Sequence, residues 1–237
     1  ARATLSVNGW SVETDRQIAI PYGGAALKPF TRYRAGLTAV DAAGEEARAE
    51  LTFETGRLDT PWAGQWISDG AYSFTEKKVS PIPMTFRRAF RLKGEVRSAR
   101  IYATAMGIYR LSLNGSRVGE DYFAPGFTSY KTNLQYQTYD VTGCLQADNT
   151  LTAVVAGGWA VGSFVFTRKN RVTADRQALL LELRVTYKDG TEEIIGTDAS
   201  WQVTEEGPLR EADLYDGEVY DATAETGGWR NAAVEKL

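Results

Sequence analysis

The chain has 237 residues, an apolar content of 43%, a formal net charge of −3 and no histidine. This composition is typical of a globular protein, and its scattered Lys and Arg residues disfavour nucleic acid or an anionic membrane as a partner. The lack of histidine excludes Ser-His-Asp and Cys-His catalysis, and the single cysteine, Cys144, excludes an internal disulfide and a multi-thiolate zinc site.

The N-terminus, ARATLSVNGW, has neither an initiator Met nor the apolar region of a signal peptide. We therefore expect the chain to be a fragment of a longer protein, and its localisation is left open. No apolar run approaches the roughly 20 residues that would cross a bilayer.

Residues 1–57 predict a small unit of short β-strands. A unit of this size would bury only about 60% of its unfolded surface, so we expect it either to pack on a neighbour or to have lost strands at its start. Turn residues at Pro21–Gly24 and Lys28–Pro29 separate the expected strands. These strands are Thr4–Val7, Gln17–Ile20, Thr31–Asp41 and Ala47–Glu54.

The stretch from Gly56 to Ile67 is expected to connect this unit to the rest of the chain. It contains Trp62 and Trp66, which we interpret as buried anchors that hold the two units together. A platform for a ligand is the alternative.

Residues 58–237 show short strand patterns at the spacing of a β-sandwich. Asn114-Gly115 and Lys188–Thr191 predict tight hairpins, and Val141–Asn149 predicts a single helical turn capped by Thr142. The predicted fold class is all-β, with two β units in the chain. The expected strands are Thr85–Leu92, Ser98–Ala105, Ile108–Leu113, Leu134–Val141, Leu151–Ala156, Ala178–Tyr187, Thr191–Ile195 and Trp201–Val203.

Aromatic and amide side chains are dense in two stretches expected to form loops. A pyranose has apolar C–H faces and a rim of hydroxyls, so a sugar site combines a flat aromatic ring with amide or carboxylate partners. Tyr130, Asn133 and Trp159 are the candidate carbohydrate-binding residues, because Tyr130 and Trp159 follow glycine-containing loop segments. The alternative is that such aromatic residues are half-buried in strands.

The segment Glu211–Asp221 places five carboxylates in eleven residues. Asp216 and Glu218 are candidate ligands for a hard cation such as Ca²⁺, although the spacing does not match an EF-hand. In an extended segment they would lie about 7 Å apart on one side, from two residues of about 3.3 Å rise. That separation suits an inverting glycosidase, but adjacent carboxylates on one strand cannot flank a bond from opposite sides. A solvated or interface-facing edge is the third interpretation.

Together these motifs resemble the bacterial α-L-rhamnosidases, over essentially the whole chain. The motifs are specific as an ordered set and unremarkable singly. They are Phe53-Glu-Thr-Gly-Arg-Leu-Asp, Trp62-Ala-Gly-Gln-Trp-Ile, Leu113-Asn-Gly with Val118-Gly, Ala124-Pro-Gly-Phe-Thr-Ser-Tyr, Tyr136-Gln-Thr-Tyr-Asp-Val-Thr, Gly157-Gly-Trp-Ala-Val-Gly and Tyr215-Asp-Gly-Glu-Val-Tyr-Asp-Ala.

The resemblance implies a multidomain inverting glycoside hydrolase that releases terminal α-L-rhamnose with acidic residues of a helical barrel absent from this chain. The resemblance also implies that residues 1–57 are a fibronectin III-like β unit, possibly incomplete. Residues 58–237 would be the jelly-roll-like antiparallel N-terminal β-sandwich of the enzyme, similar to a carbohydrate-binding module. Three hypotheses follow. The first is a non-catalytic accessory region that packs on the barrel. The second is an autonomous Ca²⁺-dependent module that binds rhamnose or a rhamnose-containing glycan, and the third is a self-contained glycosidase that uses Asp216 and Glu218.

Overall fold

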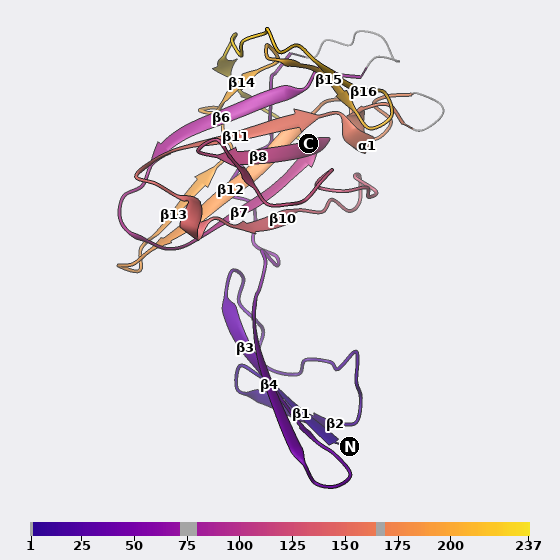
Figure 1. Cartoon of the computed structure of the whole chain (residues 1–237), viewed down its shortest axis with the longest axis vertical. Helices are drawn as coiled ribbons and strands as arrows, with labels where there is room; N and C mark the ends of the chain where they lie inside the picture. Colours follow the sequence, from indigo (N-terminus) through magenta and orange to yellow (C-terminus); the bar gives the residue numbers. More distant parts are fainter. Residues whose placement is uncertain (1, 72–79, 165–168) are drawn as a thin grey trace. The chain divides into compact units, whose positions relative to one another are not determined.

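The computed structural model describes residues 2–71, 80–164 and 169–237, and it divides into two compact units, residues 1–61 and 62–237 (Figure 1). Both units are built from antiparallel strands, so the predicted all-β class is confirmed. The fibronectin-like and carbohydrate-binding-module-like character of the expected domains, 1–57 and 58–237, stays a prediction. No helix among the described residues has the length and apolar character needed to cross a bilayer.

The first unit is a four-stranded sheet in the order β2-β1-β3-β4. Val7 and Ala35 are its buried apolar side chains among the described residues, whereas Leu37 and Leu51 are exposed. A sheet with so little buried apolar surface gains little stability of its own. The strands are β1 (Arg2–Val7), β2 (Trp10–Thr14), β3 (Arg32–Val40) and β4 (Glu46–Glu54).

One expected strand of this unit is wrong. Gln17–Ile20 is not a strand, and Ala19 has a φ of 52°, which interrupts an extended backbone. The missed strand is β2, which pairs with β1 through a two-residue turn at Asn8 and Gly9. Both turn residues have positive φ (50° and 80°), as a type I′ hairpin requires. The same Asn-Gly signal that we used at residues 114 and 115 therefore also operates at residues 8 and 9.

The second unit is a sandwich of two six-stranded sheets. One sheet has the order β10-β7-β12-β5-β18, with β13 also paired to β12, and the other has the order β17-β14-β6-β11-β8-β9. The first contains β5 (Ile67–Ser68), β7 (Val96–Met106), β10 (Gln137–Asp140), β12 (Ala178–Tyr187), β13 (Glu192–Gly196) and β18 (Ala233–Val234). The second contains β6 (Met84–Arg91), β8 (Ile108–Leu113), β9 (Ser116–Val118), β11 (Asp148–Ala156), β14 (Gln202–Thr204) and β17 (Arg230–Asn231).

Alternating side chains of both sheets meet in one apolar core. Leu181 of β12, Phe86 of β6 and Leu151 of β11 are fully buried in it, together with Trp201, whose indole N–H donates to the Gly196 carbonyl at 2.9 Å. The period-two alternation along β8 buries Tyr109, Leu111 and Leu113 and turns the intervening residues outward. This alternation creates the outer sheet surface described below.

The Trp62–Ile67 motif runs beside β12. The buried carboxylate of Glu182 accepts the Ala63 N–H at 2.8 Å, and the Gln65 N–H donates to the Thr197 carbonyl at 2.7 Å. A Cβ at Gly64 would lie 2.5 Å from the Leu181 carbonyl oxygen, so only glycine allows this approach. Trp62 packs edge-on against Tyr136, while its predicted role in joining the two units stays a prediction.

Both predicted hairpins of the sandwich are confirmed. Asn114 and Gly115 have positive φ between β8 and β9, and residues 188–191 join β12 to β13. The Asn114 side chain also accepts the Thr150 N–H and donates to Asn149, both at 2.9 Å, so it ties the turn to β11. This residue therefore supports the sheet as well as the turn.

The helical turn is shorter than expected and is capped differently. It is a 3₁₀ turn, η1 (Thr142–Cys144), and its N-cap residue is Val141. The Thr142 hydroxyl accepts the Ala99 N–H at 2.9 Å and contacts Asp140 at 2.6 Å. The expected Thr142 cap is wrong because this side chain instead links the turn to β7 and Asp140.

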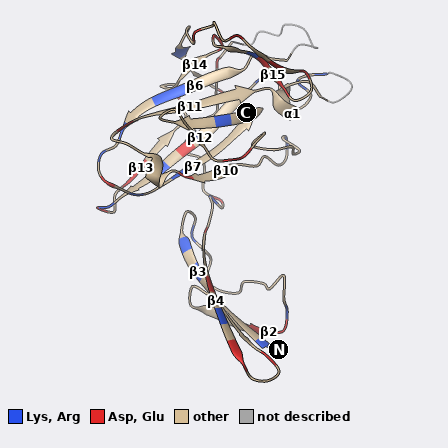
Figure 2. Cartoon of the chain, in the orientation of Figure 1, with Lys and Arg blue, Asp and Glu red and all other residues tan. Residues whose placement is uncertain are grey.

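The acidic segment, expected to be extended, folds into a hairpin. It contains β15 (Leu209–Asp213) and β16 (Gly217–Tyr220), joined by a turn at residues 214–216. These two strands pair only with each other among the described strands. In Figure 1 the hairpin and helix α1 (Gly158–Val161) lie at the same end of the sandwich. Figure 2 shows acidic and basic residues along the strands and loops of both units.

Candidate functional site

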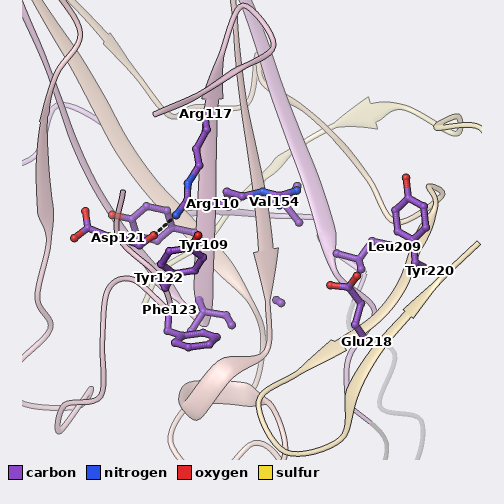
Figure 3. Close-up of a pocket in the computed structure, with 12 residues that line it drawn as sticks. Tyr109, Arg110, Arg117, Asp121, Tyr122, Phe123, Val154, Leu209, Glu218 and Tyr220 are labelled. Atoms are coloured by element: carbon purple, nitrogen blue, oxygen red, sulfur yellow. Dashed lines mark hydrogen bonds between the residues drawn. The ribbon is translucent and has the colours of Figure 1, made fainter. Parts of the chain in front are cut away.

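An open pocket of about 380 Å³ lies over the outward-facing residues of β8 and β11 (Figure 3). Its floor contains Arg110 of β8 and Val154 of β11, which are paired across the two strands, and Ala156. Arg110 points outward because its neighbours Tyr109 and Leu111 occupy the core. The same alternation that fills the core thus places a guanidinium on the floor of a pocket.

One wall of the pocket comes from β9 and the loop that follows it. The Arg117 guanidinium stacks on the Tyr122 ring at 4.3 Å from the ring centroid and donates to the Asp121 carbonyl at 2.7 Å. Tyr122 is 75% exposed and Phe123 is 53% exposed, although both line the pocket. A cation–π contact fixes the Tyr122 ring while leaving most of it accessible.

The opposite wall is the β15–β16 hairpin. Leu209 and Tyr220 are paired across the hairpin, and both line the pocket together with Glu218. Tyr220 is 60% exposed. Figure 3 shows Tyr122 and Phe123 on one side of Arg110 and the three hairpin residues on the other. The pocket therefore has an aromatic ring on each wall and a cation on its floor.

Asp213 attaches this hairpin to the segment that follows α1. Its Oδ2 accepts the Ser163 N–H at 2.7 Å and the Ser80 hydroxyl at 2.6 Å, while its Oδ1 accepts the Tyr215 N–H at 2.8 Å. The hydroxyl of the buried Ser163 donates to Asp216. These two carboxylates therefore hold the β15–β16 hairpin against Ser80 and against Ser163, which follows α1.

A buried polar pair underlies the first wall. The Tyr109 hydroxyl lies 2.7 Å from Gln137 Oε1 and 3.2 Å from the Tyr139 hydroxyl. Burial raises the pKa of Tyr139 to about 12 and raises the pKa of Tyr109 still further. Both phenols therefore stay protonated and serve as fixed hydrogen-bonding groups.

The sequence-predicted carbohydrate residues do not line this pocket, although Trp159 contacts Phe123, which does. Trp159 is half-buried in α1, with Phe123 edge-on at 6.2 Å and Phe127 at 5.8 Å between ring centroids. Tyr130 packs in the same apolar cluster as Trp159. Asn133 is exposed, and its N–H donates to the Ser129 carbonyl at 2.9 Å. The structure therefore brings Tyr130 and Trp159 together, but not around the pocket.

Tyr130 is only 5% exposed, and its hydroxyl donates to the Gly126 carbonyl at 2.7 Å. Burial raises its pKa to about 12. Its ring face is covered, so in this conformation it supports the loop that contains Phe127. A carbohydrate-binding role for Tyr130, Asn133 and Trp159 stays a prediction.

The two predicted metal ligands face different surroundings. Asp216 lies in the hairpin turn and accepts a hydrogen bond from Ser163, whereas Glu218 lies on β16 and lines the pocket. Among residues 2–71, 80–164 and 169–237 there is no group of three or more His, Cys, Asp or Glu side chains that could hold a metal ion. Because Ca²⁺ takes six to eight oxygen ligands, these two carboxylates alone do not fit a calcium site.

Sequence reasoning missed Arg110, Arg117, Leu209 and Tyr220 as members of one site. The alternation of Ile108–Leu113 was sufficient to predict that Arg110 faces outward. No local pattern could have predicted that the hairpin at residues 209–220 lies across from it, because that placement depends on Asp213, Ser80 and Ser163.

The fold and the pocket define an antiparallel β-sandwich module with an aromatic-walled pocket on its outer sheet. A family model described as the α-L-rhamnosidase N-terminal domain matches residues 94–237, which is more than half of the chain. The chain belongs to this α-L-rhamnosidase N-terminal family.

Individual relatives agree with this assignment. The chain is 45% identical over 157 residues to an α-L-rhamnosidase of Streptomyces avermitilis, a match that covers 64% of this chain and 15% of the relative. It is similar to the solved structure of the Aspergillus terreus α-L-rhamnosidase, with a TM-score of 0.88 and 27% identity over 100% of this chain and 30% of that one. The Dictyoglumus thermophilum α-L-rhamnosidase structure gives a TM-score of 0.88 at 25% identity, covering 99% of this chain and 30% of that one. The chain thus spans less than a third of each of these relatives.

Proposed function

We propose that this chain is a non-catalytic accessory region of a longer glycoside hydrolase that releases terminal α-L-rhamnose with inversion, and that its sandwich packs on and supports the catalytic barrel of the same protein. The match of residues 94–237 to the N-terminal domain of α-L-rhamnosidases carries this proposal. The small share of each relative that the chain covers also supports it, because most of those enzymes lies outside the matched region.

The described carboxylates support a structural role. Asp213 and Asp216 accept hydrogen bonds from Ser80 and Ser163, and the chain has no histidine to act as a general base. A catalytic pair in a glycosidase must instead flank a scissile bond from two sides.

The first test is hydrolysis of 4-nitrophenyl α-L-rhamnopyranoside by the purified 237-residue chain. We expect the rate to equal the blank. Turnover that rises with protein concentration and disappears in the Asp216→Asn/Glu218→Gln double variant would instead establish a self-contained glycosidase.

The second test addresses the barrel. The remainder of the parent chain, expressed separately, should bind this chain and melt at a higher temperature in its presence. If the two polypeptides elute separately at micromolar concentration and melt independently, the supporting role is wrong.

A second candidate function is an autonomous module that binds rhamnose or a rhamnose-containing glycan. The cluster of Trp159 with Phe123 and Phe127 favours it, because exposed aromatic rings suit the apolar face of a sugar. In this candidate Trp159 and Asn133 contact the sugar and Tyr130 holds the loop. Calorimetry with rhamnose, with and without Ca²⁺, tests it, and a Trp159→Ala variant with unchanged affinity would contradict it.

A further inference from the structure

The pocket between Tyr122 and Tyr220 contains two ionised side chains that the fold does not use. Arg110 on the floor and Glu218 on the hairpin wall both line it, and neither makes a hydrogen bond or ion pair among the described residues. They also form no ion pair with each other, so the pocket keeps a donor group and an acceptor group apart. Such a pair can contact a ligand that has both donors and acceptors.

A guanidinium offers five N–H donors and a carboxylate offers only acceptors. The hydroxyls of a sugar both donate and accept, so a saccharide offers partners to both Arg110 and Glu218. The exposed ring of Tyr220 supplies a flat apolar surface for its C–H faces. The Tyr122 ring on the other wall carries the Arg117 guanidinium on one face and is still 75% exposed. The pocket volume of about 380 Å³ lies within the range of small-ligand sites.

The charges also decide which sugars fit. Arg117 and Asp121 also line the pocket, so its charged lining consists of two guanidiniums and two carboxylates. An acidic sugar would gain from the guanidiniums but would meet carboxylates of the same sign as its own. A bound cation would gain from Glu218 but would lie beside the Arg110 guanidinium, and like charges at short distance repel. A neutral sugar meets neither penalty.

We propose that this outer-sheet pocket is a cation-independent binding site for a neutral saccharide, with Arg110 donating to and Glu218 accepting from its hydroxyls between Tyr122 and Tyr220. This site proposal depends on the proposed function in one respect, namely that the parent enzyme acts on glycans. It uses side chains other than Tyr130, Asn133 and Trp159, so the two sets can be tested separately.

The test is a titration of the ¹⁵N-labelled 237-residue chain followed by amide chemical shifts. The probes are methyl α-L-rhamnopyranoside as the neutral sugar and D-galacturonate as the acidic one, each with EDTA and with Ca²⁺. We expect the neutral sugar to shift amides of residues 108–110, 117–123 and 218–220 equally in EDTA and in Ca²⁺. We expect galacturonate to bind at least tenfold more weakly.

Two pocket variants and one control identify the site. Arg110→Met and Tyr220→Ala should each raise the Kd about tenfold or more, because each removes a hydrogen-bonding or stacking partner. Tyr215→Ala removes a tyrosine of the same hairpin that does not line the pocket, and it should leave the Kd unchanged. Arg110, Tyr215 and Tyr220 are exposed, so all three variants should fold.

Four outcomes would overturn the proposal. They are no shift at 20 mM neutral sugar, binding that EDTA abolishes, tighter binding of galacturonate, and unchanged Kd values in both pocket variants. None of these bears on whether the chain hydrolyses a rhamnoside or binds the remainder of its parent, so the accessory function stands or falls by its own tests.

Discussion

The buried carboxylate of Glu182 is the position where a single substitution should test the architecture of the sandwich most directly. Glu182 is fully buried on the central strand β12, and it accepts from the Ala63 N–H and from the Arg184 guanidinium, each at 2.8 Å. Glu182→Ala leaves the Ala63 N–H without this acceptor and the Arg184 cation without this counter-ion. Removing one member of a buried ion pair costs about 3–5 kcal/mol, and the lower end applies because Arg184 is 20% exposed.

We therefore expect Glu182→Ala to lower the free energy of unfolding by about 3 kcal/mol. With a urea m-value of about 2 kcal/mol/M, the midpoint should fall by about 1.5 M. Tryptophan fluorescence is a suitable readout, because Trp10 is the one tryptophan of the first unit and five others lie in residues 62–237. Glu182→Gln keeps the volume and an acceptor but loses the charge, so it should cost about 1–2 kcal/mol.

Glu192→Ala on the neighbouring strand β13 is the matched control. The Glu192 side chain is exposed and makes no hydrogen bond or ion pair among the described residues, so its loss should change the free energy of unfolding by less than about 0.5 kcal/mol. The amide of Ala63 should also exchange faster with solvent in Glu182→Ala than in the parent chain. If the two alanine variants share one urea midpoint, the reasoning about this carboxylate is wrong.

Three further predictions concern glycine packing, the hairpin and alkaline pH. Gly64→Ala should lower the free energy of unfolding by about 2–3 kcal/mol, because the added Cβ would clash with the Leu181 carbonyl and the Thr197 hydroxyl. Gly143→Ala is the control: a Cβ at Gly143 has open space around it, so this variant should be nearly neutral in the same thermal melt. Asp213→Ala removes the hydrogen bonds that attach the β15–β16 hairpin, so tryptic cleavage at Arg210 should become at least fivefold faster. Glu211 is exposed, and Glu211→Gln should not have this effect. Equal cleavage rates in the two variants would contradict the attachment through Asp213. Burial raises the pKa of Tyr130 and Tyr139 to about 12, so the stability that they contribute is intact below about pH 10 and is lost between pH 10 and 12. The Tyr130→Phe/Tyr139→Phe variant should lose less stability over that interval in urea titrations, and an equal loss would count against burial as the cause.

Much of the fold could be predicted because its signals are local. The hairpin at Asn114 and Gly115 depends on two residues with positive φ, and the strands β7, β8, β11 and β12 depend on runs of apolar side chains. Where a strand is short or polar the local signal fails. β5 and β18 have two residues each, and β15 and β16 pair only with each other among the described strands. The hairpin β15–β16 is held by Asp213, whose partners Ser80 and Ser163 are 133 and 50 residues away.

The candidate site was less predictable for the same physical reason. An aromatic residue in a loop can be a platform or a support, and only burial distinguishes them. The sequence predicts Tyr130 as a platform, but its ring is covered and its hydroxyl donates to Gly126, whereas Tyr220, part of a family motif but not a predicted site residue, is 60% exposed. Burial at these positions is set by contacts between segments that are distant along the chain, and no local pattern contains that information.

The motif Tyr215–Ala222 shows why family resemblance and ligand specificity come from different side chains. Asp216 faces Ser163 and helps to hold the hairpin on the sandwich, whereas Glu218 and Tyr220, which alternate along β16, face the pocket. A substitution at Asp216 should therefore shift the β15–β16 hairpin, which forms one wall of the pocket. A substitution at Glu218 should leave the hairpin in place and change only the contacts that a ligand makes with it. Asp213 and Asp216 are already hydrogen-bonded within the chain. In the proposed site, recognition of the saccharide therefore falls to Arg110 and Glu218, whose side chains make no hydrogen bond or ion pair within residues 2–71, 80–164 and 169–237.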